Sequence, residues 1–542
     1  MHITFANVGG TGLRLPFNAT VWIGFALMMA IAMWPAARGV IHYSAFHKGL
    51  GLLLLALLLP FLWSWNEASL IALPRMLTVT AGAILLLGIA QLPLTRRDWW
   101  WIGMAILAGA LLETAFGYVQ LYLLEPGNWL GYDPTAGRPY GIFQQVNVMA
   151  SFLVTGLVIS GWLIGEARNR LEGGVILLAP LFMPALILVI QSRTGWLAAL
   201  IAVPLVMVHL WHLDRARFRA WSGALTVGCV LAAIIWWAPW AEAGYTSKAV
   251  SAPGERLPVY LHSLKMIAQE PLTGWGYGRF QHDFLHSFAD WRAALPVNQP
   301  EIVEPIITQN YAHPHNELLY WGIEGGLLPV LAIVGFAGWV SWRLWAHGPE
   351  RERLLFTALL LPVALHAMTE FPFYHSLVHW LVFLLLLGLV ASSSWQTKTR
   401  TNRYTLGIRA GAWLVVPIVW IFMASHLQAL WQVKSFHEAR GQNAGALARV
   451  INPLGIPQDL EYLVMLRQLS TGRAETYRQW AENEAKLLPS AELYSNLIIA
   501  YEITAQKDVD IQQRFKHLFP HVAQQIDESE NTELASEPTK TL

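Results

Sequence analysis

The chain has 542 residues, of which 55% are hydrophobic and only 13% are charged, and its mean hydropathy is +0.40. Soluble globular domains carry about 25% charged residues, so the composition excludes a soluble globular protein and indicates a polytopic helical membrane protein. The formal net charge of +1 gives no reason to expect nucleic acid as a partner. The single cysteine, Cys229, excludes a disulfide framework and, because it lies in an apolar run, is expected to be buried.

Long apolar runs predict the membrane-spanning helices. A helix that crosses the hydrocarbon core of a bilayer needs about 20 mostly apolar residues. By this criterion the sequence predicts twelve spans, at 18–34, 49–65, 73–93, 99–123, 146–165, 173–191, 195–213, 221–240, 318–345, 354–370, 377–394 and 407–426. We therefore predict an all-α polytopic membrane domain over residues 1–426. Pro35 and Arg38 follow the first run in place of a small-residue cleavage site, so we expect no cleavable signal peptide.

Basic residues follow every odd-numbered span. They are Arg38 and Lys48, Arg96 and Arg97, Arg168 and Arg170, Arg215, Arg217 and Arg219, Arg343, Arg351 and Arg353, and Lys398, Arg400 and Arg403. Because Lys and Arg accumulate in cytoplasmic loops, the odd loops are predicted to be cytoplasmic. The even loops, at 124–145, 192–194, 241–317 and 371–376, are then outside. The same count places the C-terminal residues outside and leaves the side of the N-terminus open.

The sequence changes character after residue 426. Charge rises, and amphipathic helical patterns occur at 430–449, 458–470, 473–488 and 490–505, punctuated by prolines. We predict a small domain of helical hairpins over 427–526, similar to tetratricopeptide repeats although no clean 34-residue repeat is present. From residue 527 Glu, Ser, Thr and Asn dominate, which predicts a disordered tail over 527–542.

Two histidines, His313 and His315, end the longest polar loop, directly before the predicted helix 318–345. An imidazole at such a position can take a proton from a hydroxyl group near neutral pH. The alternative is a structural cap of the helix, with Asn316 and Glu317 in its first turn. Both roles are compatible, because a helix end can position a base.

Arginines of the predicted outer loops form a candidate anion site. Arg193 lies in the very short turn between spans 6 and 7, where a charge is costly unless it faces an anion or a polar cavity. Snorkelling to the interface is the alternative. Arg138, Arg256 and Arg279 are predicted on the same side, and guanidinium groups bind phosphate or pyrophosphate well.

The predicted loop over 241–317, called the large loop below, is far longer than a connection between two helices requires, which indicates a function. Residues 260–269 are predicted to form an amphipathic helix, with Leu261, Leu264 and Ile267 at helical spacing, and 271–278 to form tight turns. Such a loop can lie on the bilayer and cover a site. Glu370, an ionisable residue at membrane depth, is expected to orient a histidine or an arginine.

Several further histidines raise the question of a metal. They are His262, His282 and His286 in the large loop, and His366, His375 and His379 around residues 371–374. Three such side chains can hold a metal ion. No pair has the spacing of a helical metal motif near a carboxylate, so we predict no metal site.

Five short motifs occur in a fixed order. They are Gln191-Ser192-Arg193-Thr194-Gly195, Arg256-x-x-x-Tyr260, Pro271-x-x-Gly274-x-Gly276, His313-x-His315-Asn316 and Glu370-Phe-Pro-Phe-Tyr374. In this order they resemble the O-antigen ligase/polymerase (Wzy_C) superfamily. The ligase signature is His-Asn/Ser/Gln, nine residues, and Gly-x-x-Gly. Here His315-Asn316 is followed by the nine residues 317–325 and by Gly326-Leu-Leu-Pro329, so proline replaces the final glycine and the histidine register is kept.

A further segment narrows the resemblance. Residues 138–152, Arg-Pro-Tyr-Gly-Ile-Phe-Gln-Gln-Val-Asn-Val-Met-Ala-Ser-Phe, resemble the segment that precedes the core of protein O-oligosaccharyltransferases of the PglL type, the pilin glycosylation ligases. The C-terminal helical domain is also similar to the periplasmic extension of that branch. The resemblance covers most of the chain from about residue 100 onward.

The resemblance implies a GT-C-like enzyme of the bacterial inner membrane, with its active site and C-terminal domain in the periplasm. Such an enzyme transfers a preassembled oligosaccharide from undecaprenyl pyrophosphate to Ser or Thr hydroxyls of exported proteins such as pilin, with inversion. The implied base is His315, with His313 as a supporting or alternative base. The implied pyrophosphate ligands are Arg193 and Arg256, with Arg138 and Arg279 as further candidates, and Gln144, Asn147, Asn316 and Glu370 contact the glycan or acceptor or support the site. No metal or cofactor is implied, because arginines stabilise the leaving charge.

Two other acceptors share this chemistry. An O-antigen ligase transfers the glycan to lipid A-core, and a Wzy-type polymerase extends the O-antigen. A polysaccharide or lipid transporter without catalysis is an alternative of another class. The sequence argues against it, because no paired broken helices occur in matching halves of the chain.

Overall fold

The computed structural model describes residues 4–237, 256–294, 311–505 and 509–526. Helices form almost all of its regular structure, so the predicted all-α fold is confirmed. The chain divides into two compact units, each assembled from separate stretches of sequence. The first contains Met1–Leu55, Leu77–Val250 and Ala332–Ile456, and the second contains Ala56–Met76, Ser251–Leu331 and Pro457–Leu542.

Eleven helical segments of the described residues are long and apolar enough to cross a membrane. They are Pro16–Arg38, Ala45–Ser64, Ser69–Ile89, Arg96–Tyr122, Val146–Glu166, Arg170–Ile190, Arg193–Leu213, Arg215–Trp237, Leu327–His347, Leu377–Ser394 and Thr405–Glu438. The chain is thus a multi-pass membrane protein, as predicted. The tenth predicted span, 354–370, is a shorter helix, α14 (Arg353–Ala367), of 15 residues with Pro362 inside it. At 1.5 Å per residue it is about 22 Å long, less than the roughly 30 Å hydrocarbon core.

The ninth predicted span is two helices rather than one. The break at Gly326 separates α12 (Glu317–Gly325) from α13 (Leu327–His347), so the expectation of one helix over 318–345 is wrong. Gly326 has φ +75° and ψ −165°, a conformation open almost only to glycine. A Cβ added there would lie 2.8 Å from the carbonyl oxygen of Leu272, and Leu327 N–H donates to the carbonyl of Pro271 at 2.8 Å. The contact with the 271–272 segment therefore explains the break.

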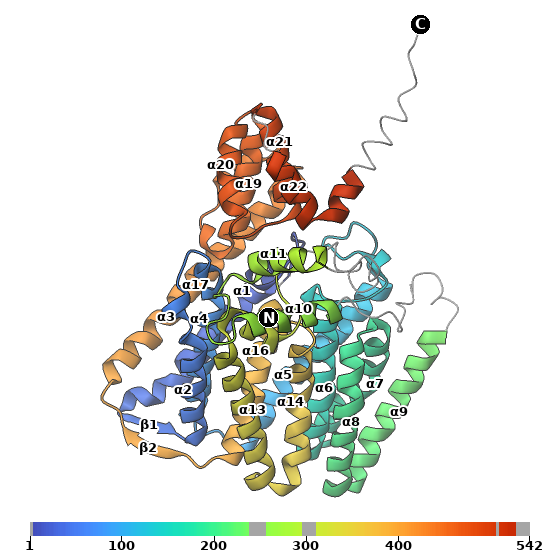
Figure 1. Ribbon diagram of the computed structural model, residues 1–542. Coiled ribbons are helices and arrows are strands. Elements are labelled where there is room, and N and C mark those ends of the chain that lie inside the picture. The colour runs from blue at the N-terminus through green and yellow to red at the C-terminus, as the bar shows by residue number, and fades with distance from the viewer. Residues whose placement is uncertain (1–3, 238–255, 295–310, 506–508, 527–542) are drawn as a thin grey trace. The chain divides into compact units, whose positions relative to one another are not determined.

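The core of the first unit surrounds α6 (Val146–Glu166), whose residues from Val148 to Gly165 are all buried. Four helices pack on it, namely α5 (Arg96–Tyr122), α7 (Arg170–Ile190), α8 (Arg193–Leu213) and α14. Figure 1 shows α6, α7 and α8 side by side. An apolar helix can be covered by lipid or by other helices, and α6 is the one of these spans that is enclosed almost entirely by protein, with 94% of its most apolar window buried.

The remaining long helices of the first unit lie around this core. α1 (Pro16–Met33) packs on α17 (Thr405–Glu438), and α9 (Arg215–Trp237) packs on α7. The first unit also contains most of α2 (Ala45–Leu58), the second part of α4 (Ser69–Ile89), most of α13 and α16 (Leu377–Ser394). A short strand pair joins β1 (Val40–Tyr43) antiparallel to β2 (Lys398–Thr401). Cys229 is exposed rather than buried, because few residues of α9 are covered by other helices.

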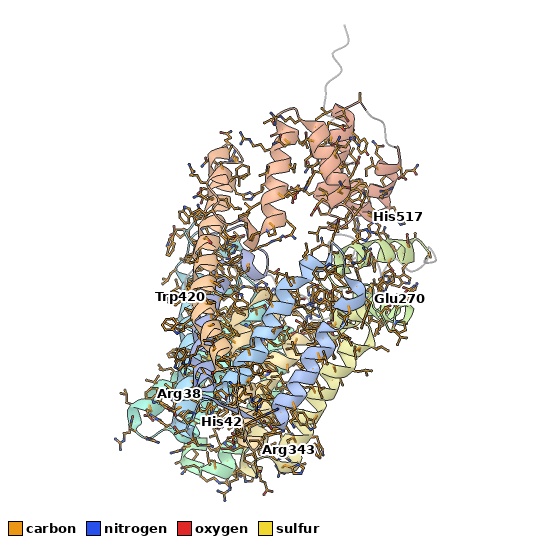
Figure 2. All side chains as sticks on the ribbon, turned by 90° about the vertical axis from the view of Figure 1, so that its left-hand side faces the viewer. Arg38, His42, Glu270, Arg343, Trp420 and His517 are labelled. Carbon is orange, nitrogen blue, oxygen red and sulfur yellow. The ribbon has the colours of Figure 1, made fainter. Side chains whose placement is uncertain are left out.

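Ion pairs show that the loops after odd-numbered spans lie at one end of the first unit. Arg96 pairs with Glu166 at 2.7 Å and with Glu352 at 2.5 Å, which joins the loops after spans 3, 5 and 9. Figure 2 places Arg38 and Arg343, which follow spans 1 and 9, at the same end as well. The loops after spans 1, 3, 5 and 9 therefore lie at the same end, and the assignment of this end to the cytoplasm stays a prediction.

The second unit holds the helices of the large loop and those of the C-terminal region. They are α3 (Phe61–Ser64), the start of α4 (Ser69–Ile89), α10 (Arg256–Gln269), α11 (Phe280–Ala293), α12, α19 (Pro457–Ser470), α20 (Ala474–Glu484), α21 (Ala491–Ile503) and α22 (Val509–Leu518). Ala289 of α11 belongs to the same apolar cluster as Tyr477, Leu497 and Phe515. The large loop and the C-terminal helices therefore share one core.

The C-terminal patterns fall on helices. The predictions for 458–470, 473–488 and 490–505 correspond to α19, α20 and α21, seen as neighbouring red helices in Figure 1. α17 runs through residue 427 without a break, and the compact units divide between Ile456 and Pro457. The predicted disordered tail, 527–542, lies outside the described residues.

Candidate functional site

The histidine motif of the second unit sits at the N-terminus of α12. Asn316 caps this helix, because its Oδ1 accepts a hydrogen bond from Leu319 N–H at 3.0 Å. The cap is therefore the asparagine, and neither histidine is needed for it. His315, directly before the cap, has a left-handed backbone with φ +56°. Such a conformation is uncommon for a residue with a Cβ and is often found at functional sites.

Two hydrogen bonds hold the backbone of His315. Its N–H donates to Nδ1 of His313 at 2.9 Å, and its carbonyl accepts from the Tyr260 hydroxyl at 2.8 Å. The two rings differ in environment: His313 is buried against Tyr320, with ring centroids 4.6 Å apart, whereas His315 is half-buried and contacts Tyr311. Burial lowers the pKa of His313 well below its ordinary value.

Buried charges lie within the same unit. Arg75 of α4 and Glu324 of α12 form an ion pair, and both side chains are buried. The guanidinium of Arg75 lies 4.4 Å from the ring centroids of both Tyr320 and Trp321, a cation–π arrangement. Sequence analysis missed this pair. The sequence did contain a signal for this pair, because Arg75 and Glu324 each lie inside a predicted membrane span. A charged residue inside a span usually has a functional role.

Glu317 lies in the first turn of α12, as expected from the sequence. It is buried, and burial raises the pKa of its carboxyl to about 8, with Arg75 opposing the shift. A carboxyl group with a pKa of about 8 is mostly protonated at pH 7. The first turn of α12 therefore carries a neutral carboxylic acid at that pH.

The glycine-rich segment docks on α12. Gly274, Gly276 and Gly278 have φ of +67°, +105° and +84°, which confirms the predicted tight turns. The amide of Gly276 donates to the Glu324 carbonyl at 3.0 Å, and the amide of Gly278 donates to the Glu324 carboxylate at 3.0 Å. Glu324 thereby ties the loop before α11 to the helix that follows the histidines.

The two arginines of the large loop differ in their surroundings. Arg279 makes a two-pronged contact with Asp283, at 2.8 and 2.6 Å, so a carboxylate already occupies the anion position in front of it. Arg256 is the first residue of α10, four residues before Tyr260 and hence on the same side of that helix. Of the two, Arg256 shares a side of its helix with Tyr260, whose hydroxyl donates to the His315 carbonyl.

The predicted helix of the large loop exists and extends over Arg256–Gln269 as α10. Its buried residues include Val259, His262 and Met266, whereas Leu261 and Leu264 of the expected apolar stripe are 49% and 54% exposed. Both sides of the helix are apolar, so the pattern alone did not reveal which one packs. The exposed leucines fit a helix that lies on a bilayer.

In the first unit, two of the candidate anion-binding arginines, Arg138 and Arg193, lie at the turn between α7 and α8. Gln191 ends α7 in a left-handed conformation, and Ser192 caps α8 by accepting from Gly195 N–H at 3.2 Å. Arg193, the first residue of α8, is exposed. Arg138 instead donates through Nε to the carbonyl of Ile190 at 2.8 Å and through Nη2 to that of Gln191 at 3.3 Å. Arg138 thus braces the turn, and Arg193 is the exposed cation at a helix N-terminus, where anions bind well.

Asn147 and Glu370 also come together in this unit. Asn147 Nδ2 donates to Glu370 Oε1 at 3.0 Å, which links the start of α6 to the segment after α14. Glu370 also acts on a histidine, as expected: burial lowers the pKa of His375, and the Glu370 carboxylate opposes this shift. Gln144, with φ +55°, lies two residues before α6, whose N-cap is Gln145.

The remaining histidines take part in separate contacts. Ser151 Oγ lies 2.7 Å from His366 Nδ1 and 3.0 Å from His379 Nε2, and the carbonyl of Phe143 accepts from His375 Nε2 at 2.6 Å. In the second unit His262 stacks on Trp291, and His282 stacks on His286. Among the residues that the structure describes, no three His, Cys, Asp or Glu side chains form a group that could hold a metal ion. Independence of a metal remains a prediction.

Comparison with known proteins finds three family matches along the chain. Residues 139–164 match the family described as protein glycosylation ligase, and they include Gln144 and Asn147. Residues 177–334 match O-antigen ligase, and they include Arg193, Arg256 and His315. Residues 354–533 match the C-terminal part of virulence factor membrane-bound polymerases.

A curated relative has a consistent name. The chain is 26% identical over 350 residues to the general O-oligosaccharyltransferase of Acinetobacter baylyi, which is 60% of this chain. The chain spans about half the length of this relative, 55%. These findings confirm the predicted resemblance of the chain to the O-antigen ligase/polymerase superfamily and, within it, to the protein O-oligosaccharyltransferases.

Proposed function

We propose that this protein transfers a preassembled oligosaccharide from undecaprenyl pyrophosphate to Ser or Thr hydroxyls of exported proteins such as pilin. The observation that carries the proposal is His315, a half-buried imidazole in a left-handed turn that two hydrogen bonds hold. The match to protein glycosylation ligases and the name of the curated relative support this choice of acceptor.

In the proposed reaction a ring nitrogen of His315 takes the proton of the acceptor hydroxyl. The oxygen then attacks the anomeric carbon of the first sugar, and the bond from that carbon to the pyrophosphate oxygen breaks. Because attack and departure take place on opposite faces, the anomeric configuration inverts. The lipid pyrophosphate leaves with an additional negative charge, and the imidazolium later returns its proton to solvent.

Guanidinium groups are proposed to stabilise that negative charge. Arg256 is a candidate because it starts the helix that carries Tyr260, and Arg193 is a candidate because it is exposed at a helix N-terminus. Arg138 and Arg279 support the proposal less, since carbonyl groups and Asp283 contact their guanidinium groups. The proposed periplasmic location of the site rests on the basic residues that follow the odd-numbered spans in the sequence.

The experiment supplies purified full-length protein with an undecaprenyl-pyrophosphate-linked glycan and either an acceptor pilin or lipid A-core. We expect the mass of the pilin to rise by one glycan. His315→Ala should lower this rate by about 10²- to 10⁴-fold, the usual contribution of a general base. His437→Ala, at an exposed position of α17, is the matched control and should transfer normally.

Other outcomes select other functions. The matches to O-antigen ligases and to membrane-bound polymerases favour a lipid acceptor as the second candidate. Glycan found on lipid A-core alone would establish ligation, and lengthened lipid-linked glycan would establish polymerisation. Transfer by His315→Ala at the rate of the control would refute the assignment of the base. Movement of the donor across vesicle membranes without any product would indicate a transporter.

A further inference from the structure

We infer that His313 and Tyr260 are positioning residues that hold His315 in its left-handed conformation, and that His313 is not a second base. The inference rests on the proposed function, which it deepens. It gives the two histidines of one short motif different roles, where the resemblance implied His315 as the base and left His313 as a supporting or alternative base.

The direction of one hydrogen bond separates the tasks. The backbone N–H of His315 can only donate, so Nδ1 of His313 accepts at 2.9 Å and carries no proton. The proton of the neutral ring is then on Nε2. In this tautomer the lone pair of Nδ1 accepts the backbone N–H of His315, and Nε2 carries the ring proton and can only donate. It therefore cannot take a proton from a substrate hydroxyl without giving up its hold on His315.

The burial of His313 keeps this arrangement in place. The ring is buried and packed on Tyr320, and burial together with the nearby charges of His315 and Arg75 holds the pKa of His313 low. A protonated ring would present an N–H to the backbone N–H of His315. The neutral ring thus remains an acceptor at the pH values at which a general base works.

Tyr260 acts on the other side of the same residue. Its hydroxyl donates to the carbonyl of His315 at 2.8 Å, so both polar groups of the His315 backbone are bound to side chains. A left-handed conformation is unfavourable for a residue with a Cβ. The two hydrogen bonds to the backbone of His315 offset this cost.

The conformation matters because φ sets the direction in which the imidazole leaves the chain. If either bond is lost, His315 can relax to another backbone region, and its ring moves away from the reacting atoms. A misplacement of about 1 Å can reduce a rate by about 100-fold. We therefore expect changes at both positions to lower kcat while the KM for the donor stays near that of the wild type.

The decisive pair of variants is His313→Asn and His313→Gln. Asparagine carries an oxygen at the same distance from Cβ as Nδ1, so it can accept from His315 N–H, whereas the oxygen of glutamine lies one atom further. We expect His313→Asn to keep kcat within about tenfold and His313→Gln to lose about 100-fold. Equal, near-complete loss in both would make His313 a base and overturn the inference.

Tyr260→Phe removes one hydroxyl and keeps the ring. We expect kcat to fall by about tenfold, with the acid limb of the kcat/KM profile at the same pH, because His315 remains the base. A shifted acid limb, or a wild-type kcat, would contradict the role of the hydroxyl. Tyr404→Phe, at an exposed position of the first unit, is the matched control.

Chemical modification of the histidines requires no catalytic turnover, so it tests this inference independently of the proposed function. Diethyl pyrocarbonate modifies accessible neutral histidines, and peptide masses identify them. We expect His315 in the full-length wild type to react at least about tenfold faster than His313, because His313 is buried with Nδ1 engaged. Faster reaction at His313 would overturn the inference even in an active enzyme. The expected order in a protein without transfer activity would leave the positioning intact and refute the function.

Discussion

Two arginines meet at the turn between α7 and α8, and their guanidinium groups have different partners. Arg138 donates to the last carbonyls of α7, whereas Arg193 is exposed at the first position of α8. A cation at the positive end of a helix dipole is unfavourable by itself. A bound anion removes this cost, which makes the position well suited to a phosphate.

Replacement of Arg193 by lysine keeps the charge and removes the planar fork. If Arg193 binds pyrophosphate through two N–H groups, Arg193→Lys should lower kcat/KM for the donor by about tenfold or more. The measurement is steady-state transfer at several donor concentrations.

Arg170→Lys is the matched control for this test, since Arg170 is the exposed first residue of α7 and follows an odd-numbered span. It should leave the kinetics unchanged. An equal effect of the two substitutions would indicate surface charge alone, and wild-type kinetics of Arg193→Lys would indicate snorkelling.

The sequence was sufficient to mark His315 and Arg193 as candidates, because each stands where a polar turn meets an apolar helix. The resemblance named His315 as the base and His313 as a supporting or alternative base. The sequence could not show how the two rings differ, since the difference lies in which nitrogen accepts a backbone N–H and in the burial of one ring. It also missed Arg75 and Glu324, whose contact joins positions 249 residues apart. Neither residue has a local signal that names its partner.

At the scale of elements, the break between α12 and α13 is the main feature that periodicity did not predict. The apolar run from Leu318 continues across Gly325 and Gly326, so its length alone indicates one helix. The helix ends because Gly326 contacts residues 271–272 closely and because Glu324 binds the glycine-rich turn at 274–278. Both causes come from a segment some 50 residues earlier in the chain.

This docking can be tested at Gly278. It has φ +84°, and an added Cβ would collide with the carbonyl of Ala68. Gly278→Ala should destabilise the protein by about 1–3 kcal/mol and lower the melting temperature by about 1–3 °C. Thermal unfolding of the full-length protein in detergent, followed by tryptophan fluorescence, measures the change.

Gly407→Ala provides the comparison, because Gly407 lies within α17 with no neighbour within 4 Å of an added Cβ. Alanine favours a helix over glycine by about 1 kcal/mol, so this variant should be as stable as the wild type or more so. A Gly278→Ala protein with an unchanged melting temperature would show that the glycine-rich turn does not dock on residue 68 as described.

For the whole molecule, composition and apolar runs were sufficient to predict a helical multi-pass membrane protein. They could not predict its compact units, because the second unit joins the stretches 56–76, 251–331 and 457–542. Contacts such as that of Tyr277 with the carbonyl of Leu57, at 2.7 Å, connect these stretches. The domains predicted from the sequence are continuous stretches of chain, so they separate residues 56–76 and 251–331 from the C-terminal helices. In the structure these stretches belong to one compact unit.

Stability of the whole protein should depend on pH through Glu317. Burial raises the pKa of this carboxyl from 4.5 to about 8 in the folded state. Because the folded pKa is above the unfolded one, the folded state binds the proton more tightly, and this contribution to stability is fully present below about pH 4.5. It is lost as the pH rises through about 8. Glu317→Gln, which stays neutral, should therefore gain stability relative to the wild type as the pH rises.

Melting temperatures at pH 5.5 and pH 8.5 test this dependence. The melting temperature of Glu317→Gln should exceed that of the wild type by more at pH 8.5 than at pH 5.5. For a chain of 542 residues, each kcal/mol of added stability corresponds to about 1 °C. Glu502→Gln, at an exposed position of α21 in the same unit, should show no such change. Other buried groups titrate equally in all three proteins, so only the differences between them are compared. The same difference at both pH values would mean that Glu317 is ionised in the folded protein, with its charge stabilised by Arg75.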